Sequence, residues 1–170
     1  MSKCFQPCPP EVRERVDRMA ALYHAPLIKE GVTFDLLFVI DPDDEDKPVL
    51  SHHGCPALAV GRLVPVKDRV KGCADVEICI DQRRYEEADP AERDALLDHE
   101  LEHLMLKTKN GETAAKRDNA GRPCLQIKKH DFDFGWFEST ARRHKAASIE
   151  VRQAGRLWVQ QQTFFPFATP

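Results

Sequence analysis

The sequence has no apolar run long enough to span a bilayer, and its N-terminus lacks the basic, apolar and small-residue order of a secretory signal. A net charge of −3 gives it no generally basic surface for nucleic acid. Its six cysteines stand without a signal peptide, which favours reduced thiols over a disulfide framework. We therefore expect a cytoplasmic protein that has no membrane partner.

The pattern of apolar residues predicts a single domain of mixed helix and sheet. With 170 residues the chain can bury a sizeable core without disulfides. Helical spacing after Pro9-Pro10 predicts a first amphipathic helix, and apolar or alternating runs at 36–40, 58–66 and 76–80 predict three strands. Further helices are expected at about 90–106 and 132–154, with Gly155 as a helix end. The fold class is thus α+β: a small sheet packed with an N-terminal helix and two later helices.

Residues 99–103 read H-E-x-x-H inside the helix expected at 90–106. Residues four apart lie on one face of a helix, so His99 and His103 can reach one metal ion. Glu100 projects from nearly the same side, where a carboxylate can deprotonate water. Asp89-Pro90-Ala91-Glu92 supplies an N-cap, a proline at the first helical position and a capping box. The spacing therefore predicts two zinc ligands and a general base on a capped helix.

A catalytic zinc normally takes three protein ligands, so one must come from elsewhere in the chain. The metzincin pattern is excluded, because it requires Gly and His where this chain has Leu106 and Lys109. The downstream candidates are Cys124, His130, Glu138 and His144. His130 is best placed, at a predicted strand-to-helix corner that backbone would hold on both sides. Glu138 on the next helix is the alternative, as a carboxylate ligand.

Other polar residues are candidates for supporting roles. Asp98, Asp131 and Asp133 could orient a ligating imidazole, although helix surface, N-cap and first-turn roles, respectively, explain them better. Donors that could stabilise the transition state are sought among Tyr85, Arg142, Arg143 and His144. An exposed strand edge around 58–66 is our first choice for binding a substrate backbone.

The chain resembles the phage and prophage metallopeptidases, small zincin-like proteins related to the SprT-like group. The resemblance rests on residues 95–104, on His130-Asp131-Phe132-Asp133-Phe134, and on Arg142-Arg143-His144. It implies His99, His103 and His130 as zinc ligands, Glu100 as catalytic base, a minimal zincin-like fold and protein or peptide substrates. It also implies the host cytoplasm as location if the gene is carried by a phage.

The resemblance covers residues from about 12 to 145, and three domain segments follow. We expect a flexible N-terminus at 1–10, a zincin-like metallopeptidase domain at 11–155 and a C-terminal tail at 156–170. Cys4-x-x-x-Cys8 and His52-His53-x-Cys55 lack the spacing of a strong second zinc site. The basic residues near 128 and 142 give only weak support for nucleic acid as a partner.

Two classes of function follow from these features. The first is a zinc-dependent metallopeptidase that uses Glu100 as general base. The second is a non-catalytic zincin-fold binding module, associated with protein or DNA, in which zinc is structural. The sequence does not indicate the substrate or the oligomeric state.

Overall fold

The computed structural model describes residues 3–43, 47–52, 55–108, 114–130 and 137–164. Its helices are α1 (Pro10–Tyr23), α2 (Ala25–Lys29), α3 (Val66–Val70), α4 (Gln82–Glu87), α5 (Pro90–Glu102), α6 (Glu138–His144) and α7 (Ile149–Phe164), with a 3-10 turn at Lys145–Ala147. Its strands are β1 (Cys4–Pro7), β2 (Phe34–Ile40), β3 (Leu50–His52), β4 (Cys55–Ala57), β5 (Ala59–Leu63), β6 (Val76–Asp81), β7 (Leu104–Leu106) and β8 (Leu125–Ile127).

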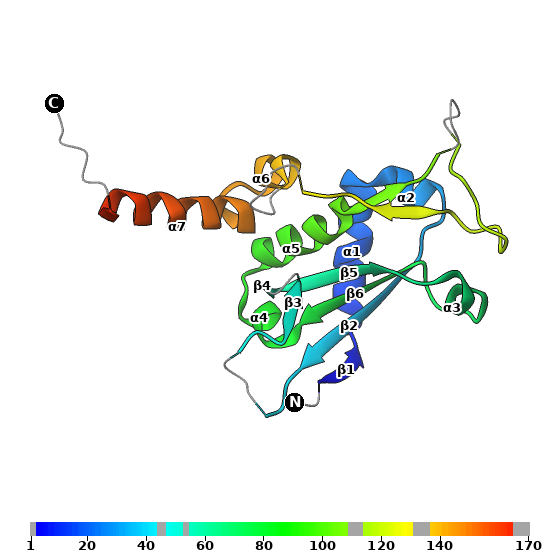
Figure 1. Cartoon of the computed structure of the whole chain (residues 1–170), viewed down its shortest axis with the longest axis horizontal. Coiled ribbons are helices and arrows are strands. Elements are labelled where there is room, and N and C mark those ends of the chain that lie inside the picture. Colours follow the sequence, from blue (N-terminus) through cyan, green and yellow to red (C-terminus); the bar gives the residue numbers. More distant parts are fainter. Residues whose placement is uncertain (1–2, 44–46, 53–54, 109–113, 131–136, 165–170) are drawn as a thin grey trace.

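The main sheet has four strands in the order β1-β2-β6-β5. β2 and β6 pair in parallel in the centre, while β1 and β5 are antiparallel edge strands. Two small antiparallel pairs, β3-β4 and β7-β8, complete the strands among the described residues. The helices α1 and α5 lie over one face of the sheet, and α7 extends away from it (Figure 1). This arrangement confirms the predicted α+β class.

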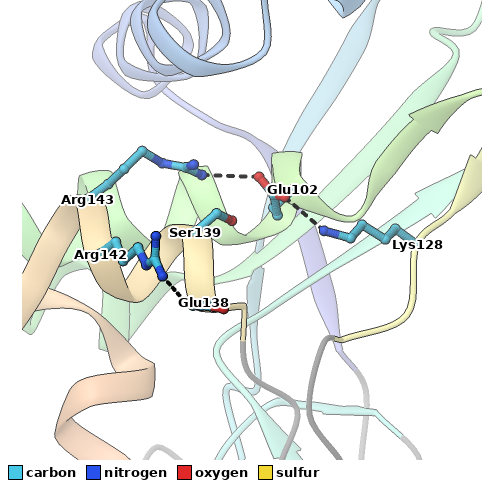
Figure 2. A pocket seen from close by; sticks show the side chains of 6 residues that line it. All are labelled: Glu102, Lys128, Glu138, Ser139, Arg142 and Arg143. Carbon is cyan, nitrogen blue, oxygen red and sulfur yellow. Dashed lines mark hydrogen bonds and ion pairs between the residues drawn. The ribbon is translucent and has the colours of Figure 1, made fainter.

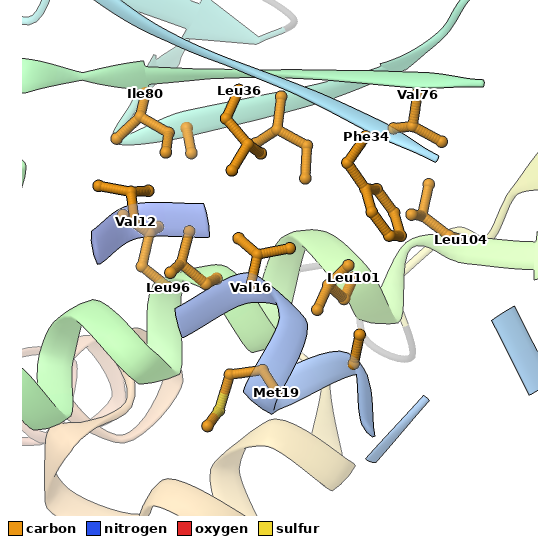
Figure 3. Packing of buried hydrophobic residues seen from close by; sticks show 14 of the residues in the cluster. Val12, Val16, Met19, Phe34, Leu36, Val76, Ile80, Leu96, Leu101 and Leu104 are labelled. Atoms are coloured by element: carbon orange, nitrogen blue, oxygen red, sulfur yellow. The ribbon is translucent and has the colours of Figure 1, made fainter. Parts of the chain in front are cut away.

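The core lies between the sheet and the helices α1 and α5. Apolar side chains from α1 and α5 meet those of β2 and β6, as Figure 3 shows for Val12, Val16, Met19, Phe34, Leu36, Val76, Ile80, Leu96, Leu101 and Leu104. Leu97 and Leu101 are fully buried, which anchors the middle and end of α5. A fully buried leucine stabilises the fold by about 1.5–3 kcal/mol relative to an exposed one. The H-E-x-x-H helix is thereby held rigidly against the sheet.

The start of α5 matches its sequence signal. Oδ1 of Asp89 accepts hydrogen bonds from the backbone N–H groups of Ala91 and Glu92, and Glu92 accepts one from the Asp89 N–H. The predicted capping box is confirmed. The helix ends at Glu102, earlier than the predicted 106, because Leu104–Leu106 pair with Leu125–Ile127 as a strand.

The predicted final helix is wrong in two respects. Among the described residues of 132–154, α6 ends at His144 and α7 begins at Ile149; between them Lys145 has a positive φ of 49°. Ser148 then starts α7 anew, since its Oγ accepts a hydrogen bond from the Val151 N–H. Gly155 also does not end the helix, which continues to Phe164.

The first ten residues include an ordered strand. Cys4–Pro7 form β1, whose register with β2 pairs Cys4 with Ile40 and Pro7 with Leu37. The segment expected to be flexible therefore contributes an edge of the main sheet. The predicted strand around 58–66 is shorter, because Ala59–Leu63 form β5 and Val66 already opens α3.

Candidate metal centre

Three histidine side chains from two segments meet at the C-terminal end of α5. His99 lies in the last turn of the helix, His103 is its C-cap residue, and His130 follows β8. The Nε2 atoms of His99 and His130 are 3.3 Å apart, and the ligand atoms of all three imidazoles lie within 4.8 Å of one another. Among the described residues, this is the one His, Cys, Asp and Glu group with such a geometry.

The spacing fits a single metal ion. Two nitrogens bound to one tetrahedral zinc at about 2.0–2.1 Å each stand roughly 3.3–3.4 Å apart. The separation of 3.3 Å between the Nε2 atoms of His99 and His130 matches this value, and a ligand atom of His103 lies within 4.8 Å of both rings' ligand atoms. The donor set of three imidazoles is one that zinc accepts in catalytic sites.

Two hydrogen bonds fix which ring nitrogen faces the centre. Nδ1 of His99 lies 2.7 Å from Oε1 of Glu150, and Nδ1 of His103 lies 2.9 Å from the carbonyl oxygen of Lys128. Both acceptors require a proton on Nδ1. The Nε2 lone pairs of His99 and His103 are therefore left to face a shared ion.

Phe137 packs against all three imidazoles. Its ring centroid lies 5.0 Å from that of His99, 4.7 Å from that of His103 and 4.8 Å from that of His130, and the side chain is fully buried. An apolar ring at this position keeps water from one side of the cluster and restricts the rotation of the imidazoles.

Burial and mutual repulsion keep two of the imidazoles neutral. Desolvation lowers the pKa of His103 to about 4, with further lowering by the charge of His99. The pKa of His130 also falls to about 4, through desolvation and the charges of His103 and His99. Burial also lowers the pKa of His99, but the hydrogen bond to Glu150 and the charges of nearby carboxylates outweigh burial and raise the pKa overall. Neutral imidazole is the form that binds metal.

Glu100 lies beside this cluster, on the side of β5. The side chain is 5% exposed, and its Oε2 accepts a 2.8 Å hydrogen bond from the backbone N–H of Gly61. Burial raises the pKa of the carboxyl, although the charges of His99 and His52 and the Gly61 N–H oppose the rise. A carboxylate whose pKa is moved towards neutrality is suited to exchanging protons with a reactant.

Asp98 forms a separate buried centre with other elements. Its carboxylate accepts hydrogen bonds from His24 at 2.7 Å, from Arg143 at 2.8 Å and from His144 at 2.9 Å. Burial raises the pKa of Asp98, but these bonds outweigh it and hold the pKa far below its usual range. Asp98 and His144 therefore join the end of α1 and helix α6 to α5, and their described bonds reach none of the three clustered imidazoles.

Glu138, the alternative ligand, points into a polar pocket next to the cluster. The pocket has a volume of about 440 Å³ and is lined by Glu102, Lys128, Glu138, Ser139, Arg142 and Arg143 (Figure 2). Glu138 forms an ion pair with Arg142, while Glu102 pairs with both Lys128 and Arg143. Three of the basic residues that gave weak support for nucleic acid binding, Lys128, Arg142 and Arg143, are thus paired with acids. Asp131 and Asp133 lie outside the described residues.

Several contacts of the centre were not predicted from the sequence. Glu150, Phe137 and the Lys128 carbonyl belong to segments with no metal motif. Gly61 carried a usable signal, because an isolated glycine in a strand pattern often marks a close backbone approach. His52, at the end of β3, is close enough for a proton on its ring to oppose the rise in the pKa of Glu100 and to add to the lowering, mainly by desolvation, of the pKa values of His103 and His130.

None of the described helices combines the length and apolar character needed to cross a membrane. Comparison with curated proteins and with solved structures gives no match. A family model described as "Putative phage metallopeptidase" matches residues 42–157, which include the H-E-x-x-H helix, His130 and Glu150. The chain belongs to this phage metallopeptidase family.

Proposed function

We propose that the protein is a zinc-dependent metallopeptidase in which His99, His103 and His130 bind Zn²⁺ and Glu100 is the general base. The observation that carries the proposal is the buried carboxylate of Glu100, one residue from His99 and on the same helix end as the three-imidazole cluster. Zinc at this site would supply Lewis acidity towards water and towards a substrate carbonyl. Glu100 would accept the proton of the attacking water and transfer it to the leaving amine.

The substrate would bind along the edge of β5 that pairs with no strand among the described residues. The Leu58 carbonyl and the Val64 N–H bond to residues at the two ends of β6, so the alternate residues Ala59, Gly61 and Leu63 turn their backbone groups outwards. Gly61 is also the residue that contacts Glu100. An extended peptide added to this edge would bring its carbonyl groups near the base. This supports protein or peptide substrates.

His52 is our candidate for stabilising the oxyanion of the transition state. It lies near enough to Glu100, His103 and His130 for a proton on its ring to act on them, and a protonated imidazole there would stabilise the oxyanion. The four groups considered from the sequence have other contacts. Tyr85 is buried against Phe38, Arg142 pairs with Glu138, and Arg143 and His144 bind Asp98.

The test compares wild type with Glu100→Gln and His103→Ala. Zinc content is measured by elemental analysis, and activity is measured as cleavage of an unfolded protein with and without a chelator. Glu100→Gln should keep about one equivalent of zinc and lose cleavage, because the ligands remain but the base is gone. His103→Ala should lose zinc and cleavage together.

Two results would contradict this proposal. Equal, chelator-insensitive cleavage by wild type and Glu100→Gln would exclude Glu100 as base. Wild-type protein with stoichiometric zinc that cleaves no substrate would support the alternative, a non-catalytic binding module with structural zinc.

A further inference from the structure

Helix α7 begins with a buried acidic residue. Glu150 is only 2% exposed and lies in the first turn of the helix, directly after the Ser148 cap. The N-terminal end of a helix carries a partial positive charge, which stabilises a carboxylate placed there. The position can therefore hold an ionised Glu150 away from solvent.

The described contacts of this carboxylate are directed at the metal centre. Oε1 lies 2.7 Å from Nδ1 of His99, a distance typical of a charge-assisted hydrogen bond. Oε2 is buried with no hydrogen-bond partner among the described residues. Burial raises the pKa of Glu150, but the bond with His99, helped by the backbone amides of Glu150 and Phe137, lowers it overall.

This contact has a geometric consequence for His99. A buried carboxylate is costly unless a partner compensates for its lost hydration, and here the partner is the Nδ1–H of the imidazole. With that proton engaged, the ring presents Nε2 to the cluster, where it lies 3.3 Å from Nε2 of His130. A carboxylate behind a ligating imidazole fixes its orientation and strengthens it as an electron donor.

We propose that Glu150 is a positioning residue of the metal centre, which holds His99 with Nε2 towards the ion from a helix far along the chain. The inference rests on the proposed function, since it takes the three imidazoles to be metal ligands. It assigns to α7 a role in metal affinity, in addition to its packing.

A second contact between the same helices provides a control. Arg152, two residues after Glu150, forms an ion pair with Glu92 near the start of α5. It connects α7 to α5 but is not bonded to an imidazole in the described contacts. Arg152→Gln therefore weakens the docking of α7 and leaves the bond between Glu150 and His99 in place.

The experiment measures Zn²⁺ affinity of the full chain by competition with a chromophoric chelator. We compare wild type, Glu150→Ala, Glu150→Gln and Arg152→Gln, each checked for folding by circular dichroism. Glu150→Ala should weaken zinc binding by about 10- to 100-fold. Glu150→Gln keeps an acceptor oxygen without the charge, so its zinc affinity should lie between those of Glu150→Ala and wild type. The zinc affinity of Arg152→Gln should match that of wild type. The visible spectrum of the Co²⁺-loaded protein should change in the two Glu150 variants alone.

Two outcomes would overturn the inference while the proposed function stands. The first is wild-type zinc affinity in both Glu150 variants. The second is an equal loss in Arg152→Gln and Glu150→Ala, which would mean that only the docking of α7 matters. If Glu150→Ala does not fold, the zinc affinity and the Co²⁺ spectrum of the isosteric Glu150→Gln variant decide whether Glu150 positions His99. A wild-type protein that binds no zinc would instead contradict the proposed function itself.

Discussion

The backbone N–H of Gly61 donates a 2.8 Å hydrogen bond to Oε2 of Glu100. One residue belongs to an edge strand and the other to the buried turn of α5, so the bond connects the proposed substrate edge with the proposed base. It also requires close approach, because a Cβ added at Gly61 would lie 3.3 Å from the same Oε2.

Replacement of Gly61 should therefore reduce cleavage without loss of metal. The methyl group of Gly61→Ala displaces the Glu100 carboxylate, and we expect kcat to fall by about 10-fold or more, since small misplacements of reacting groups are costly. Zinc affinity should stay near that of wild type. Gly155→Ala is the control, because nothing lies within 4 Å of the added Cβ there and alanine favours a helix. An unchanged kcat in Gly61→Ala would argue against a role of Gly61 in positioning the Glu100 carboxylate.

His52 should affect turnover and not metal binding. We expect His52→Gln to lower kcat by about 10- to 100-fold, because it removes the imidazole that we propose stabilises the oxyanion. Zinc affinity, measured by chelator competition, should remain within about 2-fold, since His52 is not a member of the three-imidazole cluster. Ser51→Ala, which alters the neighbouring exposed residue on β3, should behave as wild type. A similar kcat in His52→Gln and Ser51→Ala would exclude His52 as the group that stabilises the oxyanion.

Asp98 should make stability depend on acid pH. Its folded-state pKa is lowered, so its contribution is complete above the ordinary carboxyl pKa of about 4 and is lost as the pH falls further. At pH 7, Asp98→Asn should lower the free energy of unfolding by about 3–5 kcal/mol, because it removes the buried carboxylate that His24, Arg143 and His144 share as a hydrogen-bond partner. Urea denaturation from pH 7 to pH 3 should show the difference from wild type shrinking below pH 4.

Asp94→Asn is the matched control for this experiment. Asp94 pairs with Arg15 and Arg18, but Arg18 is half exposed, so solvent screens the interaction. Its replacement should cost only about 0–1 kcal/mol. Equal losses in the two variants would contradict the assignment of Asp98 as a buried structural centre.

The thiols should differ in their reaction with iodoacetamide. Burial and the nearby Cys79 raise the pKa of Cys8 to about 12, and burial with Glu77 raises that of Cys79 to about 11. Both hold almost no thiolate at pH 8, whereas Cys73 is exposed. Peptide mass mapping should find Cys73 alkylated before Cys8 and Cys79, which should stay protected until the protein unfolds. Equal labelling rates in the folded protein would refute this.

Features of the fold that depend only on residues close together in the sequence could be predicted from the sequence. The capping box of α5, the proline-led start of α1 and the existence of strand β6 all follow from side chains a few positions apart, although β6 is buried on both faces and does not alternate. The final helix was mispredicted, because the backbone leaves the α-helical conformation at Lys145, which has a positive φ, and forms a 3-10 turn over Lys145–Ala147. Periodicity alone does not reveal such a break.

His99 and His103 could be placed side by side from the sequence alone, because helix geometry puts residues four apart on one face whatever the rest of the chain does. The remaining contacts were decided by the tertiary structure. Glu150 lies 51 residues from His99, and Gly61 lies 39 residues from Glu100. These pairs meet because α5 packs on the sheet beside β5 and because the chain turns back to begin α7 next to it. Such contacts depend on how helices and strands pack against one another, which the spacing of residues along the sequence does not show.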